Sequence, residues 1–251
     1  MSEPMVDDKP QKGNPHRLTI NQHVYPARSI ERFADTTGTV EVWLRRNNKT
    51  FRASPDNPLF CARRTWDQRA EFGYMKAIED EFQILADRIV NGGAMLTAEE
   101  SLAASRFFIL WQLRAQQRHN PIGDAPVAGV APDPLTKDQR EQLEELVMFM
   151  NSDQTLSGRF VSGLHILGEI DRSLTQLTNA RWGVVTAHEG EFLLPESFGY
   201  CCQIPIAPSR CLVYGHADTI IPECEVAKAN RVAVALDTDY LVARDLARCP
   251  R

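Results

Sequence analysis

The residues near the start of the chain that could do chemistry are a histidine, a tyrosine and two arginines at close spacing: His23, Tyr25, Arg28 and Arg32. The residue before Pro26 is biased toward extended backbone, and the apolar residues after it recur at helical spacing. The segment should therefore run extended and then enter a short helix. This change of direction would bring the imidazole and both guanidiniums together beside a helix N-terminus, where they could bind a phosphate or a carboxylate.

A structural role for the same residues is the alternative. His23 would then bond to backbone in a loop, and the arginines would pair with carboxylates such as Glu31, Asp35 or Glu79. Arg114, a charged member of an otherwise apolar helical run, is a further candidate for the anion site. The predicted anion-binding residues are His23, Arg28, Arg32 and Arg114.

Two carboxylates are the candidates for acid–base catalysis, Glu79 and Glu196. Glu79 lies in a long amphipathic segment, and Glu196 lies among loops. The other polar residues of these loops are His188, Glu189, Glu191 and Ser197. Such a group could support acid–base or metal-assisted hydrolysis, although loop carboxylates are usually only solvated. His165 and Glu169 stand four residues apart and could form a similar pair, but no third ligand follows at a useful spacing.

The cysteines do not predict a metal site. They stand at positions 61, 201, 202, 211, 224 and 249 and form no CxxC pair, and the adjacent Cys201 and Cys202 would point to opposite faces of a strand. Buried free thiols in a reducing compartment are the favoured interpretation. The sequence has no P-loop, GxSxG, GxGxxG or EF-hand pattern and indicates no particular cofactor.

An N-terminal hairpin and two long helices should position these groups. Residues 40–44 alternate like a strand, residues 50–52 return, and Asn47 and Asn48 tolerate the positive φ of a two-residue turn. A first long helix should cover residues 68–90, and a capping box at Thr97 should begin a second one that ends near residue 117. The large side chains that we expect to be buried together are Phe72, Ile78, Phe82, Phe108, Trp111 and Trp182.

The second half of the chain should hold further helices and most of the sheet. A capping box at Thr136 predicts a helix with an apolar face that includes Leu143, Leu146, Val147 and Met150. Another helix should cover residues 158–177. Residues 182–186 and 192–194 should form a hairpin, and residues 201–206 and 211–214 two more strands. A last helix should begin at Pro222, and residues 240–243 should form a short strand or a turn.

Together these elements predict an α+β fold in which N- and C-terminal strands join an antiparallel sheet packed against a central set of helices. The length of 251 residues suits a single domain over residues 18–251, with a disordered tail at residues 1–17 and an exposed linker at about residues 121–135. We expect a cytoplasmic protein without a membrane partner, because no apolar run is long enough to span a bilayer and the N-terminus lacks a secretory signal.

The formal net charge of -5 is unevenly distributed along the chain. Residues 1–70 hold 12 Lys and Arg against 8 Asp and Glu, whereas the rest of the chain is acidic. A basic segment can face an anionic partner. This excess is small beside that of dedicated nucleic-acid binders, so a solvated surface is the alternative.

Several short segments carry a resemblance to a known family. They are QHVYPARSIERFA at 22–34, the hairpin that begins VEVW, AIEDEF, RFFILWQLRAQQR, RWGVVTAHEGEFLLPES, PIAPSRCLVYG and AKANRVAVALDTDYLVARD. In these segments the chain resembles a widespread bacterial and phage family known as a domain of unknown function, number four-two-three-eight. The resemblance covers most of residues 20–245 and implies an architecture but no established activity.

The resemblance also implies which residues correspond to the family's recurring positions. The matching residues are His23 and Pro26 at its opening, Phe33 in its first helix, Arg114 in a middle helix and Asn230 late in the chain. The family pattern has Ser-Asp before one turn, where this chain has Pro195, Glu196 and Ser197.

Two functions are compatible with these observations. The first is association with nucleic acid or a nucleotide, with hydrolysis of phosphodiester bonds by Glu79 or Glu196. The second is a non-catalytic interaction or inhibitor module, from a phage or mobile element, that binds a host protein complex. The first function requires His23, Arg28 and Arg114 to converge in one pocket, whereas the second predicts that they are dispersed and that an apolar patch is exposed.

Overall fold

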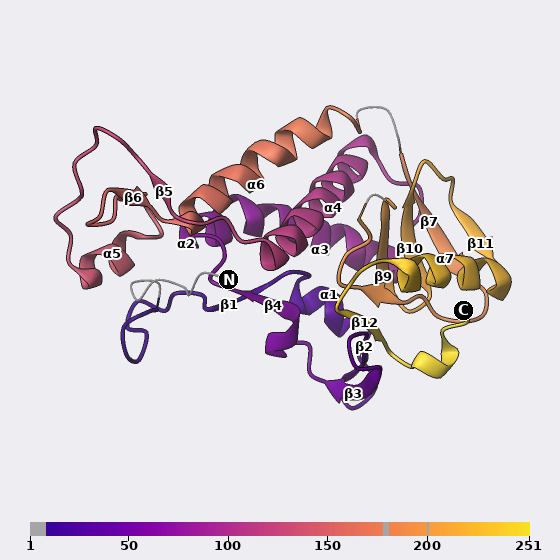
Figure 1. The fold of residues 1–251 in the computed structure, drawn as a ribbon. Helices are drawn as coiled ribbons and strands as arrows, with labels where there is room; N and C mark the ends of the chain where they lie inside the picture. The colour runs from indigo at the N-terminus through magenta and orange to yellow at the C-terminus, as the bar shows by residue number, and fades with distance from the viewer. Residues whose placement is uncertain (1–8, 178–180, 200) are drawn as a thin grey trace.

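Helices occupy the middle of the molecule and most strands lie toward one side (Figure 1). The computed structural model describes residues 9–177, 181–199 and 201–251. The helices are α1 (Ala27–Glu31), α2 (Gln68–Ala70), α3 (Lys76–Val90), α4 (Ala98–His119), α5 (Lys137–Leu143), α6 (Gly158–Leu174) and α7 (Glu223–Ala235), with the π-helical turn η3 (Glu71–Met75) and the 3-10 turns η2 (Pro58–Phe60) and η4 (Leu246–Arg248). The strands are β1 (Asn21–His23), β2 (Val40–Leu44), β3 (Lys49–Ala53), β4 (Cys61–Arg63), β5 (Ala125–Pro126), β6 (Thr155–Leu156), β7 (Trp182–Ala187), β8 (Leu194–Pro195), β9 (Gln203–Ala207), β10 (Arg210–Tyr214), β11 (Thr219–Ile221) and β12 (Tyr240–Ala243).

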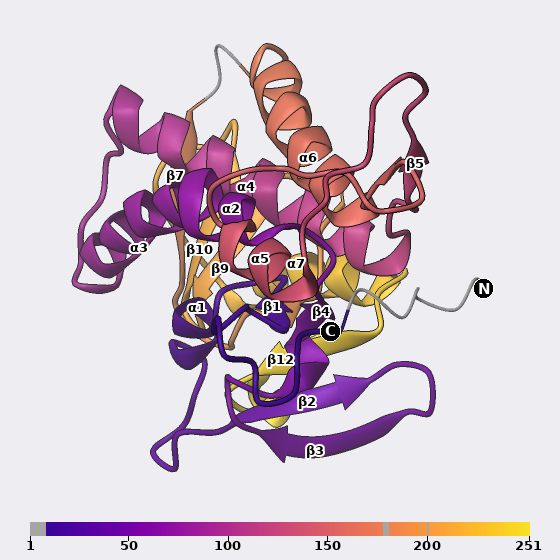
Figure 2. The same ribbon diagram turned by 90° about the vertical axis from the view of Figure 1, so that its left-hand side faces the viewer.

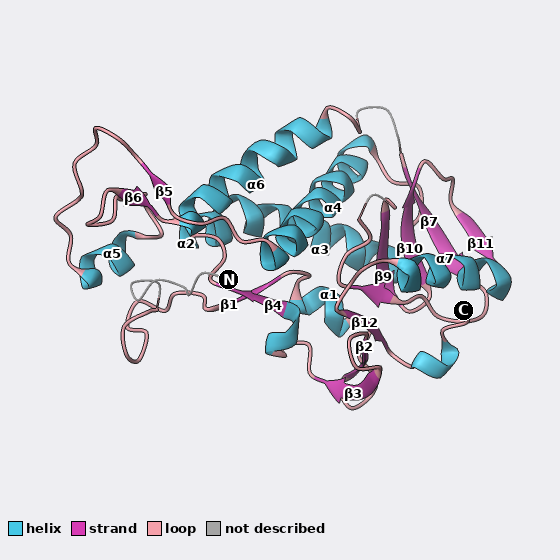
Figure 3. Cartoon of the chain, viewed as in Figure 1, coloured by secondary structure: helices cyan, strands magenta, loops and turns pink. Residues whose placement is uncertain are grey.

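Two four-stranded sheets hold most of these strands (Figure 3). In the order β3-β2-β12-β8, the N-terminal hairpin pairs with the C-terminal strand β12. The second sheet has the order β11-β7-β10-β9, in which β11 runs parallel to β7 and the other pairs are antiparallel. Figure 2 shows β2, β3 and β12 below the helices. The predicted α+β class is confirmed, but the described strands do not form one sheet, because β1 pairs with β4 and β5 with β6 outside the two four-stranded sheets.

Local signals placed several elements correctly. The hairpin β2–β3 has Asn48 at its tip with a φ of 50°, the left-handed backbone that Asn tolerates. Both capping boxes are present, at Thr97 before α4 and at Thr136 before α5. Strand β9 pairs with β10, helix α7 follows Pro222, and residues 240–243 form the strand β12.

The predicted hairpin between residues 182–186 and 192–194 is wrong. Strand β7 pairs with β10 and β11, whereas β8 pairs with β12 in the other sheet. The connection between β7 and β8 passes from one sheet to the other, and its residues Phe192 and Leu193 are buried on the way. A short Gly-containing loop between two apolar runs resembles a hairpin turn in sequence, but long-range pairing decides the partner.

The predicted apolar stripe of the first long helix matches the buried residues except at its start. Phe72 is 51% exposed, whereas Phe82 is fully buried. The cause is η3, where Gly73 leaves the helical region with a φ of -89° and a ψ of -114°. This turn changes the direction in which preceding side chains point, so a stripe counted at regular helical spacing fails before residue 75.

Aromatic side chains from distant segments form the core between the helices and the sheets. The rings of Phe82 and Phe107 stack with their centroids 3.7 Å apart, and the centroids of Tyr25 and Trp111 are 4.6 Å apart. Phe108, Trp111 and Trp182 are buried as predicted. Ile78 is only partly buried at the edge of the same core.

The segment that contains α5 projects from the helical body at the left of Figure 1. Helix α5 ends at Leu143, so the predicted continuous apolar face beyond this residue is not formed, and Leu146 is 69% exposed. Residues 9–17, the described part of the predicted tail, run beside α5, and residues 1–8 of that tail lie outside the described residues. His16 Nε2 lies 2.7 Å from Asp138 Oδ1, and the backbone N–H of Gln11 donates to Glu141 Oε1 at 2.8 Å.

Within the part of the chain that the structure describes, no helix is both long enough and apolar enough to cross a bilayer.

Candidate functional site

A cavity of about 750 Å³ lies between α4, α6 and the loops that follow β8 and precede β12. Its apolar wall includes Phe108, Ile109 and Leu113 of α4, and Leu177 comes from the segment after α6. Ligand sites typically measure about 300–1,000 Å³ and combine an apolar wall with a few convergent polar groups. The size and lining of this cavity therefore suit a small organic ligand.

His119, Glu196 and Asp239 converge at the wall of this cavity. One ligand atom from each of them lies within 4.8 Å of the other two. His119 Nε2 is 3.0 Å from Glu196 Oε1, and the backbone N–H of Asp239 donates to Glu196 Oε2 at 3.1 Å. The Glu196 side chain is 1% exposed, whereas those of His119 and Asp239 are 42% and 55% exposed. A buried carboxylate is thus held between two more accessible groups.

The pairing of β8 with β12 brings Glu196 and Asp239 together. Pro195 is opposite Leu241, so Glu196 continues β8 toward the residues that precede β12, and its N–H donates to the carbonyl of Tyr240 at 3.3 Å. From α4, the indole N–H of Trp111 donates to the carbonyl of Glu196 at 2.6 Å. The backbone of Glu196 is therefore fixed by both the sheet and the helix.

The last turn of α4 supplies the positive partners of Glu196. Arg118 Nη1 lies 2.9 Å from Glu196 Oε1, and Arg118 Nη2 lies 3.7 Å from the carboxylate of Asp239. Cationic side chains are favoured at a helix C-terminus because they oppose the partial negative charge there. Arg118 compensates one of the two carboxylate charges.

The rest of the lining is rich in hydrogen-bond acceptors. The carboxylates of Glu169 and Asp237 face the same cavity, and none of the described residues that line it is Lys or Arg. Two buried polar atoms of the lining, Gln112 Nε2 and Thr238 Oγ1, have no hydrogen-bond partner among the described residues. Buried polar groups are rarely left unsatisfied, so these atoms indicate a polar ligand or water in the cavity.

The predicted anion-binding residues do not form one pocket. Arg28 Nη2 and Arg32 Nη2 each lie 2.6 Å from one of the two carboxylate oxygens of Asp87. His23 Nε2 is 3.2 Å from the carbonyl of Pro55. These contacts match the alternative in which His23 bonds to backbone and the arginines pair with a carboxylate, here Asp87. Anion binding at Arg28 and Arg32 stays a prediction, and it would require the displacement of Asp87.

Arg114 lies in a separate buried network with Glu79. It is 2% exposed, forms a short contact with Glu79, and lies 3.4 Å from Glu71 and 5.1 Å above the ring of Trp66. Arg114 Nη1 also donates to the carbonyl of His23 at 3.2 Å. Burial disfavours the charge of Arg114, but Glu79 and Glu71 more than offset this effect and raise its pKa. Of the two predicted catalytic carboxylates, Glu79 is thus engaged in this ion network and Glu196 lines the cavity.

The polar loop group around Glu196 is also divided. His188 and Glu189 are exposed, and buried Glu191 pairs with Arg244 and with Arg248, none of which lines the cavity. Ser197 remains near Glu196 and forms a short hydrogen bond with Gln112.

Two further residues singled out in the sequence, Glu169 and Asn230, have structural partners. Glu169 pairs with Arg172 at 3.0 Å. The Asn230 side chain, singled out by the family resemblance, donates to the carbonyl of Glu191 at 2.8 Å and accepts from the N–H of Leu193 at 2.8 Å. It therefore fixes the connection that leads to β8.

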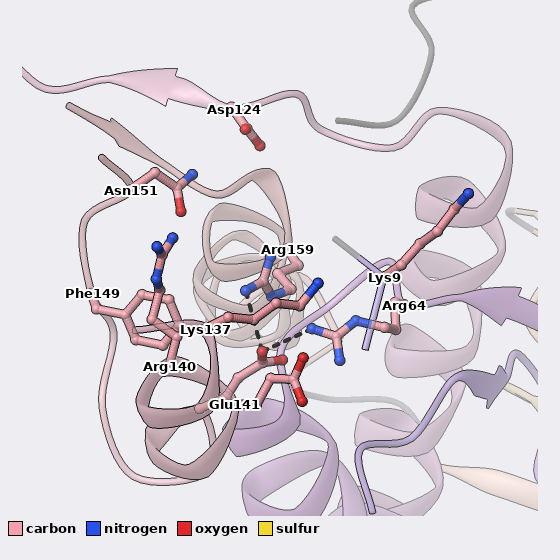
Figure 4. A pocket seen from close by; sticks show the side chains of 10 residues that line it. Lys9, Arg64, Asp124, Lys137, Arg140, Glu141, Phe149, Asn151 and Arg159 are labelled. Carbon is pink, nitrogen blue, oxygen red and sulfur yellow. Dashed lines mark hydrogen bonds and ion pairs between the residues drawn. The ribbon is translucent and has the colours of Figure 1, made fainter. Parts of the chain in front are cut away.

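A second cluster of charges lies where α5 and α6 meet the segment after β4 (Figure 4). Arg64 and Arg159 approach the same oxygen of Glu144 at 2.8 Å and 3.2 Å, and Figure 4 shows Lys9 and Lys137 beside these arginines. The space among them is about 20 Å³, which is room for about one water molecule. This cluster stabilises the packing of α5, and it leaves no room for a substrate.

Sequence reasoning missed His119, Arg118 and Asp239. The sequence contains an Arg-His pair in the last turn of a helix and an Asp before a short strand. Residues at such positions usually have structural roles, so neither feature indicates a site. The β8–β12 pairing brings Asp239, 43 positions away, to Glu196, and the packing of α4 brings Arg118 and His119 there.

Comparisons of this chain with protein-family models, with curated proteins and with solved structures give no significant match. The resemblance to the domain-of-unknown-function family stays a prediction.

Proposed function

We propose that the protein binds a nucleotide in the cavity between α4 and α6 and hydrolyses a phosphodiester bond there. This site differs from the predicted pocket of His23, Arg28 and Arg114, which these residues do not form. The observation that carries this proposal is the 3.0 Å contact between His119 Nε2 and buried Glu196 at the wall of a cavity of about 750 Å³. A cavity of this size accommodates a nucleotide.

The lining suits the hydrogen-bond donors of a nucleoside. Carboxylates such as those of Asp237 and Glu169 accept from ribose hydroxyls and from exocyclic amino groups, and Phe108 and Leu113 offer an apolar surface for a base. The amide of Gln112 and the hydroxyl of Thr238 are available for further bonds with the ligand.

The His119–Glu196 pair is placed to transfer a proton. If Nε2–H donates to Glu196, the other ring nitrogen of His119 carries a lone pair and can accept a proton from water. The water oxygen then forms a bond to phosphorus, the P–O bond to the leaving ribose oxygen breaks, and the imidazolium returns its proton to that oxygen. Water is consumed, and the products are a phosphomonoester and an alcohol.

We also infer a cytoplasmic location. All six cysteines are free, including the buried Cys211 and Cys249, which is the state expected in a reducing compartment. Burial raises the pKa of both buried thiols, so they are protonated and unreactive near neutral pH.

A pair of tryptophan substitutions tests the binding site. Ser173→Trp places a large ring in the cavity, whereas Thr175→Trp places the same ring on the exposed side of the same helix end. We expect a panel of mononucleotides and linear and cyclic dinucleotides to raise the melting temperature of the wild type and of Thr175→Trp but not of Ser173→Trp. A panel that stabilises neither the wild type nor the control, or that stabilises all three equally, contradicts the proposal.

A second candidate function is the interaction module that binds a host protein complex. The observation that favours it is the run Leu146, Val147 and Met148, which are 69%, 44% and 38% exposed on the projecting α5 segment. Affinity capture from host lysate with the wild type and with Leu146→Ser/Val147→Ser tests it. A specific protein that is captured only by the wild type supports this function, and identical captures argue against it.

A further inference from the structure

We propose that His119, Glu196 and Asp239 bind one divalent transition-metal cation at the cavity wall. Their nearest ligand atoms lie within 4.8 Å of one another, so a single ion can contact all three after small side-chain rotations. One imidazole and two carboxylates form a ligand set that suits Mn²⁺, Fe²⁺ or Zn²⁺ better than Ca²⁺. Three protein ligands also leave a position open toward the cavity, as in catalytic metal sites.

The groups around Glu196 already form the outer shell that such a site needs. The N–H of Asp239 orients Glu196 Oε2 at 3.1 Å, and the guanidinium of Arg118 lies 2.9 Å from Oε1. Hydrogen-bond partners of metal-bound carboxylates fix the orientation of the ligand before the metal binds. Glu196 is therefore preorganised, and His119 and Asp239 are exposed enough to close around an ion.

The charges at this wall favour a cation. Glu196 and Asp239 contribute two negative charges, Arg118 contributes one positive charge, and the lining adds the carboxylates of Glu169 and Asp237. This surface would repel the phosphate of a nucleotide. A divalent ion at the wall adds two positive charges to the His119, Glu196, Asp239 and Arg118 group, which weakens this repulsion.

This inference rests on the proposed function only for the identity of the substrate, because the cation site is defined by its own ligands. If His119, Glu196 and Asp239 held the ion, it would supply the activation of water that the His119–Glu196 pair otherwise provides.

Titration of the full chain with Mn²⁺, followed by the decrease of the free-ion EPR signal without any nucleotide, tests the site. Mn²⁺ is the probe because the exposed Cys201 and Cys224 would bind Zn²⁺ through their thiolates. We expect one saturable site in the wild type, and at least a roughly tenfold lower affinity in His119→Ala and in Asp239→Asn.

The matched controls are His165→Ala, a histidine on α6, and Asp80→Asn, an exposed carboxylate on α3 that pairs with Lys76. Both should bind Mn²⁺ like the wild type. No saturable binding by the wild type at millimolar Mn²⁺, or equal affinities in the ligand variants and the controls, overturns the cation site.

The two proposals fail separately. Ser173→Trp should bind Mn²⁺ like the wild type while it loses nucleotide binding. If the wild type binds nucleotides through the cavity but no Mn²⁺, the cation site is wrong and the proposed function stands. If Mn²⁺ binds through His119 and Asp239 but no nucleotide binds, the cation site stands and the proposed substrate is wrong.

Discussion

Arg114 and Glu196 are both buried charges, and their surroundings give them different roles. Arg114 is enclosed by Glu79, Glu71 and the ring of Trp66, so its guanidinium forms its ion pairs within the core. Glu196 is equally buried, but its partner His119 is open to a cavity. An arginine that the sequence predicts to bind an anion can therefore be a buried core residue. The spacing of charged residues along the chain does not distinguish these two roles.

Arg114→Met should strongly destabilise the fold. It leaves Glu71 and Glu79 without their common cation in a poorly hydrated place, and breaking a buried ion network of this kind costs about 3–5 kcal/mol. Arg28→Met is the control, because its side chain is 61% exposed and an exposed pair contributes about 0–1 kcal/mol. Urea unfolding of both variants measures the difference, and equal midpoints would show that the Arg114 network is not stabilising.

The ion pairs of Asp87 should make the stability of the fold depend on pH in a direction that can be worked out. The hydrogen bond from Arg32, together with the charges of Arg32 and Arg28, holds the pKa of Asp87 below its usual value. A depressed folded-state pKa contributes stability above the unfolded pKa near 3.9, and this stability is lost as the pH falls through the folded pKa. Wild type should therefore exceed Asp87→Asn in stability at pH 7, by less than about 1 kcal/mol because the pair is exposed. The difference should shrink as the pH falls below about 3.9, and a difference that stays constant at lower pH would argue against this ion pair.

The same substitution tests the predicted anion site. Asp87→Asn removes the shared carboxylate of Arg28 and Arg32, so single-stranded DNA should bind this variant more tightly than the wild type at low salt. Fluorescence titration at two ionic strengths measures this effect, with Asp80→Asn as a control for the change of charge. Equal affinities of the two variants would exclude a latent anion site at these arginines.

At the scale of elements, features with local causes could be predicted and those with long-range causes could not. Thr97 and Thr136 begin α4 and α5 because a capping box involves only neighbouring residues, and Asn48 forms its turn for the same reason. The pairing of β8 with β12 joins residues more than 40 positions apart. The sequence instead predicts a local hairpin between residues 182–186 and 192–194, which the structure does not contain. Glu196 could be selected because it is a loop carboxylate, but its partners could not.

The π-helical turn at η3 makes a testable difference between two phenylalanines of one helical segment. Phe82→Ala should cost about 3–5 kcal/mol, because the side chain is fully buried and stacks on Phe107. Phe72→Ala should change stability by less than about 0.5 kcal/mol, because its side chain is 51% exposed. Thermal melts of both variants measure the contrast, and a large loss for Phe72→Ala would contradict the direction that η3 gives to this residue.

At the scale of the whole molecule, the helices and the two sheets share a core from which the α5 segment projects (Figure 1). Asp124 accepts from the N–H of Gly158 at 2.8 Å, and Asp133 accepts from the N–H of Met150 at 2.8 Å. Residues 128–132, between these two contacts, are exposed. The predicted linker at about residues 121–135 is therefore fastened near both of its ends.

Limited proteolysis should first cut the chain at residues 128–132, because exposed backbone without hydrogen-bonded partners is the easiest to fit into a protease. The two products should stay associated through the Glu144 cluster and the core. Mass spectrometry of the first fragments locates the cut, and a first cut inside α6 would contradict this view of the segment.

We infer that the chemistry of this molecule lies at Glu196 and not at Glu79. Phosphorus NMR can follow the hydrolysis of linear and cyclic dinucleotides by the wild type, by Glu196→Gln and by Glu79→Gln, each at a temperature where circular dichroism shows a folded protein. Loss of a proton-transfer pair costs about 100- to 10,000-fold in rate, so we predict turnover by the wild type and by Glu79→Gln and none that is detectable for Glu196→Gln. Undiminished turnover by Glu196→Gln, or turnover that is lost only in Glu79→Gln, would contradict the account.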